Sequence, residues 1–171
     1  NMLNALARSG PAESLGVPGA AAEKGLNKFT GSSRRFQLVG KMPNGATVVD
    51  DYAHHPSEMK ATLMTAKEMR FDRILCAFQP HTYTRTKALF PEFVEALKLC
   101  DQAVLAPIYA AREQNTVGVY SSDLAKEVPG AVAFDSFEEI ADYLRGEAGP
   151  NDLVLTMGAG NINQVGPMLI K

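Results

Sequence analysis

The residues of this chain whose types suggest chemistry gather in three short segments. These segments are Asp51-Tyr-Ala-His-His-Pro56, Gln79-Pro-His-Thr-Tyr-Thr-Arg85 and Gly158-Ala-Gly-Asn161. The chain of 171 residues contains three histidines, and all of them, His54, His55 and His81, lie in the first two segments. Each segment directly follows an apolar run, so the pattern predicts a binding or catalytic site built from loops.

The second segment is suited to holding an anion. Arg85 presents a planar guanidinium that can bind a carboxylate or phosphate through two parallel hydrogen bonds, and His81 can add a further donor. An anion at a helix N-terminus would also interact with the free backbone N–H groups there. The alternative is a solvated loop in which Arg85 pairs with an acid such as Glu58.

The first segment is suited to a nucleotide. Asp51 could accept hydrogen bonds from ribose hydroxyls, and Tyr52 offers a flat face for stacking. Alternatively, Asp50 and Asp51 cap a helix that begins at Pro56. A zinc site formed by the histidines is a third possibility, although the neighbourhood supplies no further ligand except a carboxylate.

The third segment, Gly158-Ala-Gly160, resembles the start of a dinucleotide-binding fingerprint. The third glycine and the acidic partner for the ribose are missing from it. It therefore predicts only a close approach of backbone to a ligand. Two alternative functions remain open from it: a small oxidoreductase domain or a free-standing nucleotide-binding module.

The elements that must position these segments are predicted from hydrophobic patterning. The predicted strands are residues 47–50, 73–78, 102–106, 131–134 and 152–157. The predicted helices are residues 56–69, 89–99, 122–128, 137–145 and 162–171. Asn44-Gly45 predicts a hairpin that joins residues 35–39 to residues 46–50.

Continuous apolar strands that alternate with helices indicate an α/β fold, with a mostly parallel sheet covered by helices on both faces. In such sheets ligands bind beyond the carboxyl ends of the strands. All three segments follow predicted strands, so we expect them to converge at one edge of the sheet.

Residues 1–32 are predicted to be a short helical leader. The pattern of residues 1–9 and of residues 20–29 is helical, and the cluster Thr30-Gly31-Ser32-Ser33 marks the boundary with the main domain, residues 33–171. The chain begins with Asn1 in a helical pattern and not with Met, so we expect it to be a fragment of a longer protein.

Composition restricts the class of protein. Apolar residues make up 46% and charged residues 21% of the chain, and the formal net charge is -2. These values are typical of a globular protein and give no sign of a nucleic-acid partner. No apolar run approaches the roughly 18 residues of a membrane span, and residues 1–9 do not have the basic-then-apolar layout of a secretory signal. Cys76 and Cys100 have no metal or redox spacing, so we expect reduced core thiols in a cytoplasmic protein.

Five segments, in this order, resemble the C-terminal part of the Mur ligase family. They are Asn1-Met-Leu-Asn-Ala5, Arg34-Arg-Phe-Gln37, Val49-Asp-Asp-Tyr-Ala-His-His-Pro56, Phe78-Gln-Pro-His-Thr-Tyr-Thr-Arg-Thr86 and Gly158-Ala-Gly-Asn-Ile162. The third and fourth segments point to the branch of the family that adds alanine.

The resemblance implies an ATP-dependent carboxylate–amine ligase of peptidoglycan synthesis and cell wall formation. Such an enzyme joins L-alanine to UDP-N-acetylmuramate through an acyl phosphate that the amine attacks. By this resemblance, residues 1–32 are the helical tail of a central ATPase domain, and residues 33–171 are a C-terminal Rossmann-like domain that closes over the site. The partners implied are the protein's own N-terminal and central domains.

The resemblance also implies roles for individual residues. The residues matched to ATP binding are Asn1 and Asn4 at the adenine, Arg35 at the phosphates, Asp51 at the ribose and Tyr52 beside them. The residues matched to substrate binding are His54, His81 and Arg85, the last two receiving the L-alanine carboxylate.

The resemblance has one departure and one gap. Some family members carry a basic residue at the position of Thr82, so the carboxylate is expected to depend more on Arg85 here. The glycine-rich phosphate loop and the groups that hold Mg²⁺ are expected in the part of the ATPase domain that this chain lacks. No catalytic or metal-binding residue is therefore assigned, and the fragment alone is expected to be inactive.

Overall fold

The structure is a computed structural model that describes residues 18, 20–21 and 32–171. The chain divides into two compact units, Asn1–Ser32 and Ser33–Lys171, and the second is the one described below. Asn1, Asn4, the helix predicted over residues 1–9 and nearly all of that predicted over residues 20–29 lie outside the described residues.

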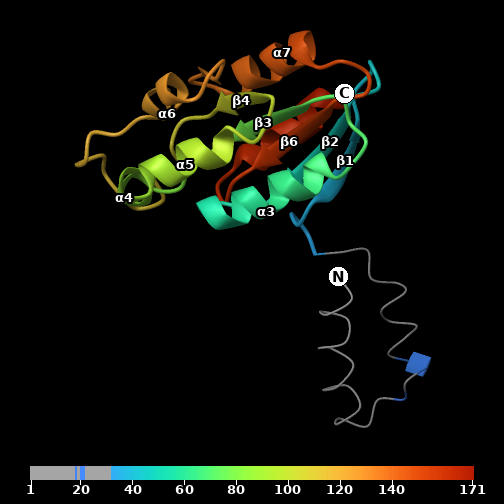
Figure 1. Ribbon diagram of the computed structural model, residues 1–171, viewed down its shortest axis with the longest axis horizontal. Helices are drawn as coiled ribbons and strands as arrows, with labels where there is room; N and C mark the ends of the chain where they lie inside the picture. The colour runs from blue at the N-terminus through green and yellow to red at the C-terminus, as the bar shows by residue number, and fades with distance from the viewer. Residues whose placement is uncertain (1–17, 19, 22–31) are drawn as a thin grey trace. The chain divides into compact units, whose positions relative to one another are not determined.

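A sheet of six strands forms the centre of the second unit (Figure 1). The strands are β1 (Gln37–Lys41), β2 (Thr47–Asp51), β3 (Ile74–Phe78), β4 (Gln102–Leu105), β5 (Val132–Ala133) and β6 (Leu153–Met157). Their order across the sheet is β1-β2-β6-β3-β4-β5. Only β1 is antiparallel to its neighbour, so the mostly parallel sheet and the hairpin are both confirmed.

Helices cover both faces of this sheet. They are α3 (Pro56–Lys67), α4 (Tyr83–Ala88), α5 (Phe90–Leu97), α6 (Ser121–Glu127), α7 (Phe137–Glu147), the 3₁₀ helix η1 (Ile162–Gln164) and α8 (Val165–Leu169). Leu63 of α3 and Phe93 of α5 are buried in the core on one face. Leu144 of α7 and Leu169 of α8 belong to the core on the other, and Figure 1 shows α7 and α3 on opposite sides of the sheet. The predicted α/β architecture is therefore confirmed.

The hairpin depends on the Asn44-Gly45 pair that predicted it. Asn44 Oδ1 accepts a hydrogen bond from the N–H of Ala46 at 3.1 Å, and the N–H of Gly45 donates to the carbonyl of Met42 at 2.9 Å. Gly45 has a φ of +102°, a conformation that glycine adopts without steric cost. The turn therefore sets the register of β1 on β2.

Two helical segments differ from the prediction. Residues 83–88, predicted as part of a turn, form helix α4. The single helix predicted over residues 162–171 is a 3₁₀ turn followed by α8, which ends at Leu169. Pro167 has no backbone N–H, so it cannot make the bond that would continue an α-helix from residue 163.

The two cysteines are free thiols, with Cys76 buried in β3 and Cys100 half-buried behind α5. A hydrogen bond with Cys100, together with burial, raises the pKa of the Cys76 thiol well above its usual value. Across the described part of the chain, no helix is both long enough and apolar enough to span a membrane.

Candidate functional site

The three segments singled out from the sequence meet at the carboxyl edge of the sheet. They follow β2, β6 and β3, which are neighbours in that order. The N–H of Gly158 donates to the carbonyl of Asp51 at 3.1 Å, and the N–H of Gln79 donates to the carbonyl of Met157 at 3.0 Å. The predicted convergence is therefore observed.

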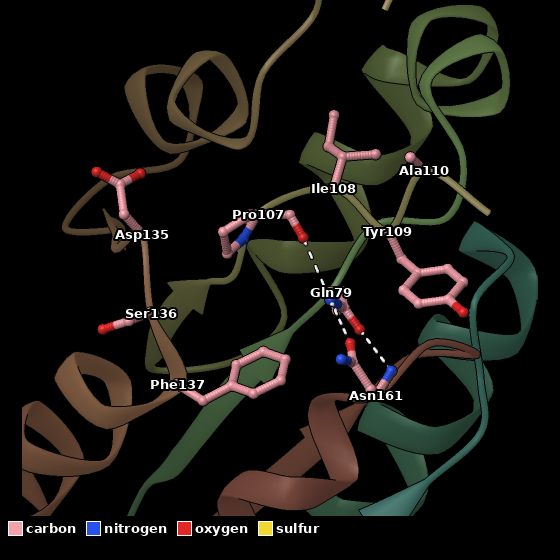
Figure 2. A pocket seen from close by; sticks show the side chains of 9 residues that line it. All are labelled: Gln79, Pro107, Ile108, Tyr109, Ala110, Asp135, Ser136, Phe137 and Asn161. Carbon is pink, nitrogen blue, oxygen red and sulfur yellow. Dashed lines mark hydrogen bonds between the residues drawn. The ribbon is translucent and has the colours of Figure 1, made fainter. Parts of the chain in front are cut away.

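The side chain of Gln79 joins the loops that follow β3, β4 and β6. Its Oε1 accepts the N–H groups of Asn161 and Ile162 at 2.9 and 3.1 Å. Its Nε2 donates to the Asn161 side chain at 3.0 Å and to the carbonyl of Pro107 at 3.3 Å, as Figure 2 shows. All of these groups are in the loops after β3, β4 and β6. Because Gln79 is buried and fully hydrogen-bonded, it holds the loops in register.

The glycines of the third segment allow the loops to pack closely. Gly158 has a φ of +148°, and a Cβ there would lie 2.7 Å from the carbonyl oxygen of Gln79. A Cβ on Gly160 would overlap the side chains of Gln79 and Tyr109. The close approach predicted from these glycines is thus an approach to Gln79. The resemblance to a dinucleotide fingerprint, and with it the oxidoreductase alternative, has no support from this geometry.

Arg34 ties the hairpin to the glycine loop. Its Nη1 and Nη2 donate to the carbonyls of Gly160 and Gly158 at 3.0 and 2.6 Å. Its Nε donates to Asp50 Oδ2 at 2.8 Å, and Asp50 also accepts the hydroxyl of Thr156 at 2.7 Å. The carboxylate of Asp50 is buried. Sequence reasoning missed Arg34, whose only signal was its place beside Arg35.

Arg35, in contrast, is exposed and makes no hydrogen bond or ion pair with the described residues. Its guanidinium lies 5.9 Å from the centre of the Tyr52 ring, which is itself 37% exposed. The guanidinium of Arg34 lies over the same ring at 5.0 Å, so both arginines and Tyr52 are brought together.

Asp51 is buried and organises the backbone around it. Its Oδ2 accepts the N–H of Phe36 at 2.8 Å, and its Oδ1 accepts the N–H of Ala53 at 2.7 Å. Each carboxylate oxygen keeps a second lone pair, so a further hydrogen bond to Asp51 is chemically possible.

The cap of α3 is His55, and not Asp50 or Asp51. His55 Nδ1 accepts the N–H of Ser57 at 3.3 Å, and Glu58 Oε2 accepts the N–H of His55 at 3.2 Å. The alternative in which the two aspartates cap this helix is therefore wrong. Glu58 Oε2 lies 3.3 Å from His54 Nδ1, and within the described residues Glu58 makes no ion pair with Arg85.

A row of rings crosses the edge from β2 to β4. The ring of His54 lies 5.5 Å from that of Tyr52 and 6.0 Å from that of His81, measured between centroids. His81 stacks on Tyr109 at 5.4 Å with an interplanar angle of 12°. His55 is turned to the helix cap, so the three histidines do not meet. Among residues 32–171, no three histidine, cysteine or carboxylate side chains form a metal site.

His81 has an unused polar atom. Its Nδ1 is buried and has no hydrogen-bond partner among the described residues. Burial, assisted by the charge of Arg85 and by His54, lowers the pKa of His81 below its ordinary value. The imidazole is therefore neutral at neutral pH, and its buried Nδ1 is an unsatisfied polar atom at the carboxyl edge of the sheet.

Arg85 lies beside His81 on helix α4. Its Nη1 donates to the backbone carbonyl of His81 at 3.1 Å, which leaves its other N–H groups without partners in the described residues. The side chain is half-buried, so a bound anion would be partly shielded from water. This geometry fits the predicted carboxylate or phosphate site, and the solvated loop paired with Glu58 is wrong.

Glu113 explains why residues 83–88 are helical. Thr82, the N-cap of α4, makes no side-chain cap of its own. Glu113 Oε1 accepts the hydroxyls of Thr82 and Thr84, both at 2.5 Å, and Oε2 accepts the N–H of Thr84 at 3.0 Å. The hydrogen bonds from Thr82 and Thr84 lower the pKa of Glu113 to about 2. This cap comes from the loop after β4, so no local pattern could predict it.

A pocket of about 370 Å³ lies next to this row, between Tyr109 and Phe137 at the start of α7 (Figure 2). Gln79 and Asn161 also line it, and they are bonded to each other. None of the predicted site residues lines the pocket. The row of rings with Arg85 is therefore the better candidate site.

Comparison with known proteins supplies the family. Residues 34–160 match the model of the Mur ligase glutamate ligase domain. The chain belongs to the Mur ligase family. The curated relatives of this Mur ligase chain include two UDP-N-acetylmuramate–L-alanine ligases, from Agathobacter rectalis at 47% identity and from Clostridium tetani at 48%.

These relatives align with 100% of the Mur ligase chain, which spans 38% of the length of each of them. Among solved structures, UDP-N-acetylmuramate–alanine ligase from Thermotoga maritima is 30% identical, with a TM-score of 0.76. That match covers 99% of this chain and 36% of the other. The predicted resemblance and the Rossmann-like α/β fold are both confirmed.

Proposed function

We propose that this chain is the L-alanine-binding, closing part of an ATP-dependent ligase that joins L-alanine to UDP-N-acetylmuramate through an acyl phosphate. The proposal is supported by the names of the relatives that align with the whole chain. The observation that carries it is the pair formed by His81 and Arg85. Both have polar atoms without partners in the described residues, and both lie at the edge where sheets of this type bind ligands.

In this function, Arg85 binds the carboxylate of L-alanine through its guanidinium fork. The neutral ring of His81 offers a further hydrogen bond beside it, and His54 lines the same space. The charge-assisted contact orients the amino acid so that its amine points toward the reacting carbonyl. Holding reactants in this way lowers the barrier by removing the entropy cost of bringing them together.

The nucleotide is assigned to the neighbouring loops. Arg35 is exposed and suited to the phosphates, Tyr52 offers its face, and Asp51 keeps lone pairs for the ribose. Asn1 and Asn4 would lie at the adenine. ATP supplies the phosphoryl group that activates the substrate carboxylate. Mg²⁺ would be held by residues other than the described ones, which form no metal cluster of their own.

The partners of this part are then the N-terminal and central domains of the same protein. ATP and a UDP-sugar are metabolites of the cytoplasm, so the proposed reaction takes place there. The product would serve peptidoglycan synthesis.

The test is steady-state kinetics of the full-length protein, with each substrate varied in turn. Arg85→Ala should raise the KM for L-alanine by at least about tenfold, which corresponds to roughly 1.4 kcal/mol. The KM for ATP should change far less, and Arg85→Lys should not restore binding because lysine lacks the fork geometry.

Arg70→Ala is the matched control, because Arg70 is an exposed arginine between α3 and β3, at the opposite edge of the sheet. It should leave both constants unchanged. If Arg85→Ala leaves the KM for L-alanine unchanged and raises that for ATP, Arg85 belongs to the nucleotide and the proposal is wrong.

A further inference from the structure

Helix α4 carries Arg85 but is too short to be stable by itself. It has six residues, and isolated helices shorter than about 12 residues are marginal in water. Its N-cap, Thr82, makes no side-chain cap hydrogen bond. The position of Arg85 must therefore be fixed by contacts from outside the helix.

The loop after β4 supplies those contacts from two sides. Glu113 accepts three hydrogen bonds from Thr82 and Thr84 at the start of α4. At the other end of the same loop, the N–H of Tyr109 donates to the carbonyl of Pro80 at 2.8 Å, and its ring stacks on His81. The loop thus contacts the chain immediately before and immediately after His81.

The carboxylate of Glu113 also matches the needs of a helix start. The first N–H groups of a helix have no partners within it, and a negative charge there is favoured. Here the carboxylate accepts hydrogen bonds from two hydroxyls as well as from the N–H of Thr84. It therefore fixes the orientation of the first turn, in addition to placing a negative charge beside it. Arg85 is the third residue of α4 and is bonded back to His81. Any rotation of the first turn would therefore move the guanidinium.

We propose that Glu113 is a positioning residue for the amino-acid substrate, which holds α4 so that Arg85 and His81 present their donors to one carboxylate. This inference rests on the proposed function of Arg85. The side-chain hydrogen bonds of Glu113 go to Thr82 and Thr84 and not to Arg85 or His81. Its action passes through Thr82, Thr84 and the first turn of α4.

The experiment uses the full-length ligase and the variant Glu113→Gln, which keeps the size of the side chain and removes its charge. A glutamine cannot accept all three hydrogen bonds in the same arrangement, because its amide nitrogen is a donor. The KM for L-alanine should rise about fivefold, in line with the loss of a helix cap. The kcat at saturating L-alanine and the KM for ATP should stay within about twofold of the wild type.

Glu92→Gln is the matched control. Glu92 is an exposed glutamate in the first turn of the neighbouring helix α5, and it makes no side-chain hydrogen bond with the described residues. It should leave the KM for L-alanine unchanged. Glu113→Asp keeps the charge on a shorter side chain, so its KM should lie between those of the wild type and Glu113→Gln.

A double variant separates positioning from a general loss of structure. If Glu113 acts through Arg85, then Glu113→Gln should add no further increase in the KM for L-alanine when Arg85 is already alanine. Effects of the two substitutions that multiply would overturn the inference, as would an unchanged KM in Glu113→Gln alone.

The result also remains informative if the proposed function is wrong. Should Arg85→Ala raise the KM for ATP instead, the role of Arg85 changes, and a rise in that same constant in Glu113→Gln would still support positioning. If the two single variants affect different constants, Glu113 does not position Arg85.

Discussion

The two sides of the candidate site use their polar groups differently. On the side of β2 and β6, Arg34, Asp50 and Asp51 are hydrogen-bonded within the chain through short, partly buried contacts. On the side of β3 and β4, the Nδ1 of His81 has no partner in the described residues, and Arg85 uses one N–H group for its neighbour.

This difference separates a scaffold from a binding surface. Buried polar groups are normally paired, and an exception requires an explanation such as a missing ligand. Arg34 and Asp50 on the β2–β6 side have their partners already and hold the loops together. The β3–β4 side has polar atoms for which a ligand is the natural partner. Substitutions of the paired residues Arg34 and Asp50 should therefore reduce stability, and substitutions of His81 and Arg85 should reduce binding.

Arg34→Ala should have the largest effect. It leaves the buried carboxylate of Asp50 without its charged partner, and breaking a buried pair in this way costs about 3–5 kcal/mol. Denaturant unfolding of the chain should show this loss in the free energy of unfolding. Arg35→Ala, one residue away and exposed, should change it by less than about 0.5 kcal/mol. Equal losses for the two arginines would contradict the division into scaffold and binding surface.

Gly158→Ala should be the next most damaging change. Its φ of +148° is disfavoured for alanine, and the added Cβ would displace the backbone of Gln79. We expect a loss of about 3 kcal/mol in the free energy of unfolding. Gly130→Ala is the control, because Gly130 has a φ of +74° but no atom within 4 Å of an added Cβ, so it should lose about 1 kcal/mol. Equal losses would show that conformation alone matters and that loop packing at Gly158 does not.

The smallest effect concerns the Glu113 cap in acid. The native pKa of about 2 is below the ordinary value of 4.5, so the fold favours the ionised form. The stabilisation by Glu113 is then complete above about pH 4.5 and is lost as the pH falls toward 2. The Tm difference between wild type and Glu113→Gln should shrink over that range. A Tm difference independent of pH would mean that the charge of Glu113 is not what holds α4.

Local patterns predicted most of this fold because the relevant signals are themselves local. Asn44-Gly45 sets a turn by its own backbone preference, and the apolar runs that became β3 and β6 are buried along their whole length. The edge where the three loops meet then follows from the parallel arrangement alone.

The parts that could not be predicted depend on residues distant in sequence. Helix α4 has three β-branched or aromatic residues in its first four positions, which favours reading it as a turn, and its cap comes from Glu113. The difference between Arg34 and Arg35 arises because only the first reaches the carbonyls of Gly158 and Gly160. Adjacent arginines give no such information in a sequence.

The place of β6 in the sheet also bears on how the protein is made. Among the six strands of this sheet β6 is the last to be synthesised, yet it lies between β2 and β3. Until residue 157 has been synthesised, the hairpin and the β3–β4–β5 group have no shared strand, and the loops of the candidate site cannot meet. We therefore expect translation to produce two incomplete half-sheets with exposed edges, which are prone to pair with other chains. A nascent chain stalled before β6 should be captured by chaperones, and one released after it should not.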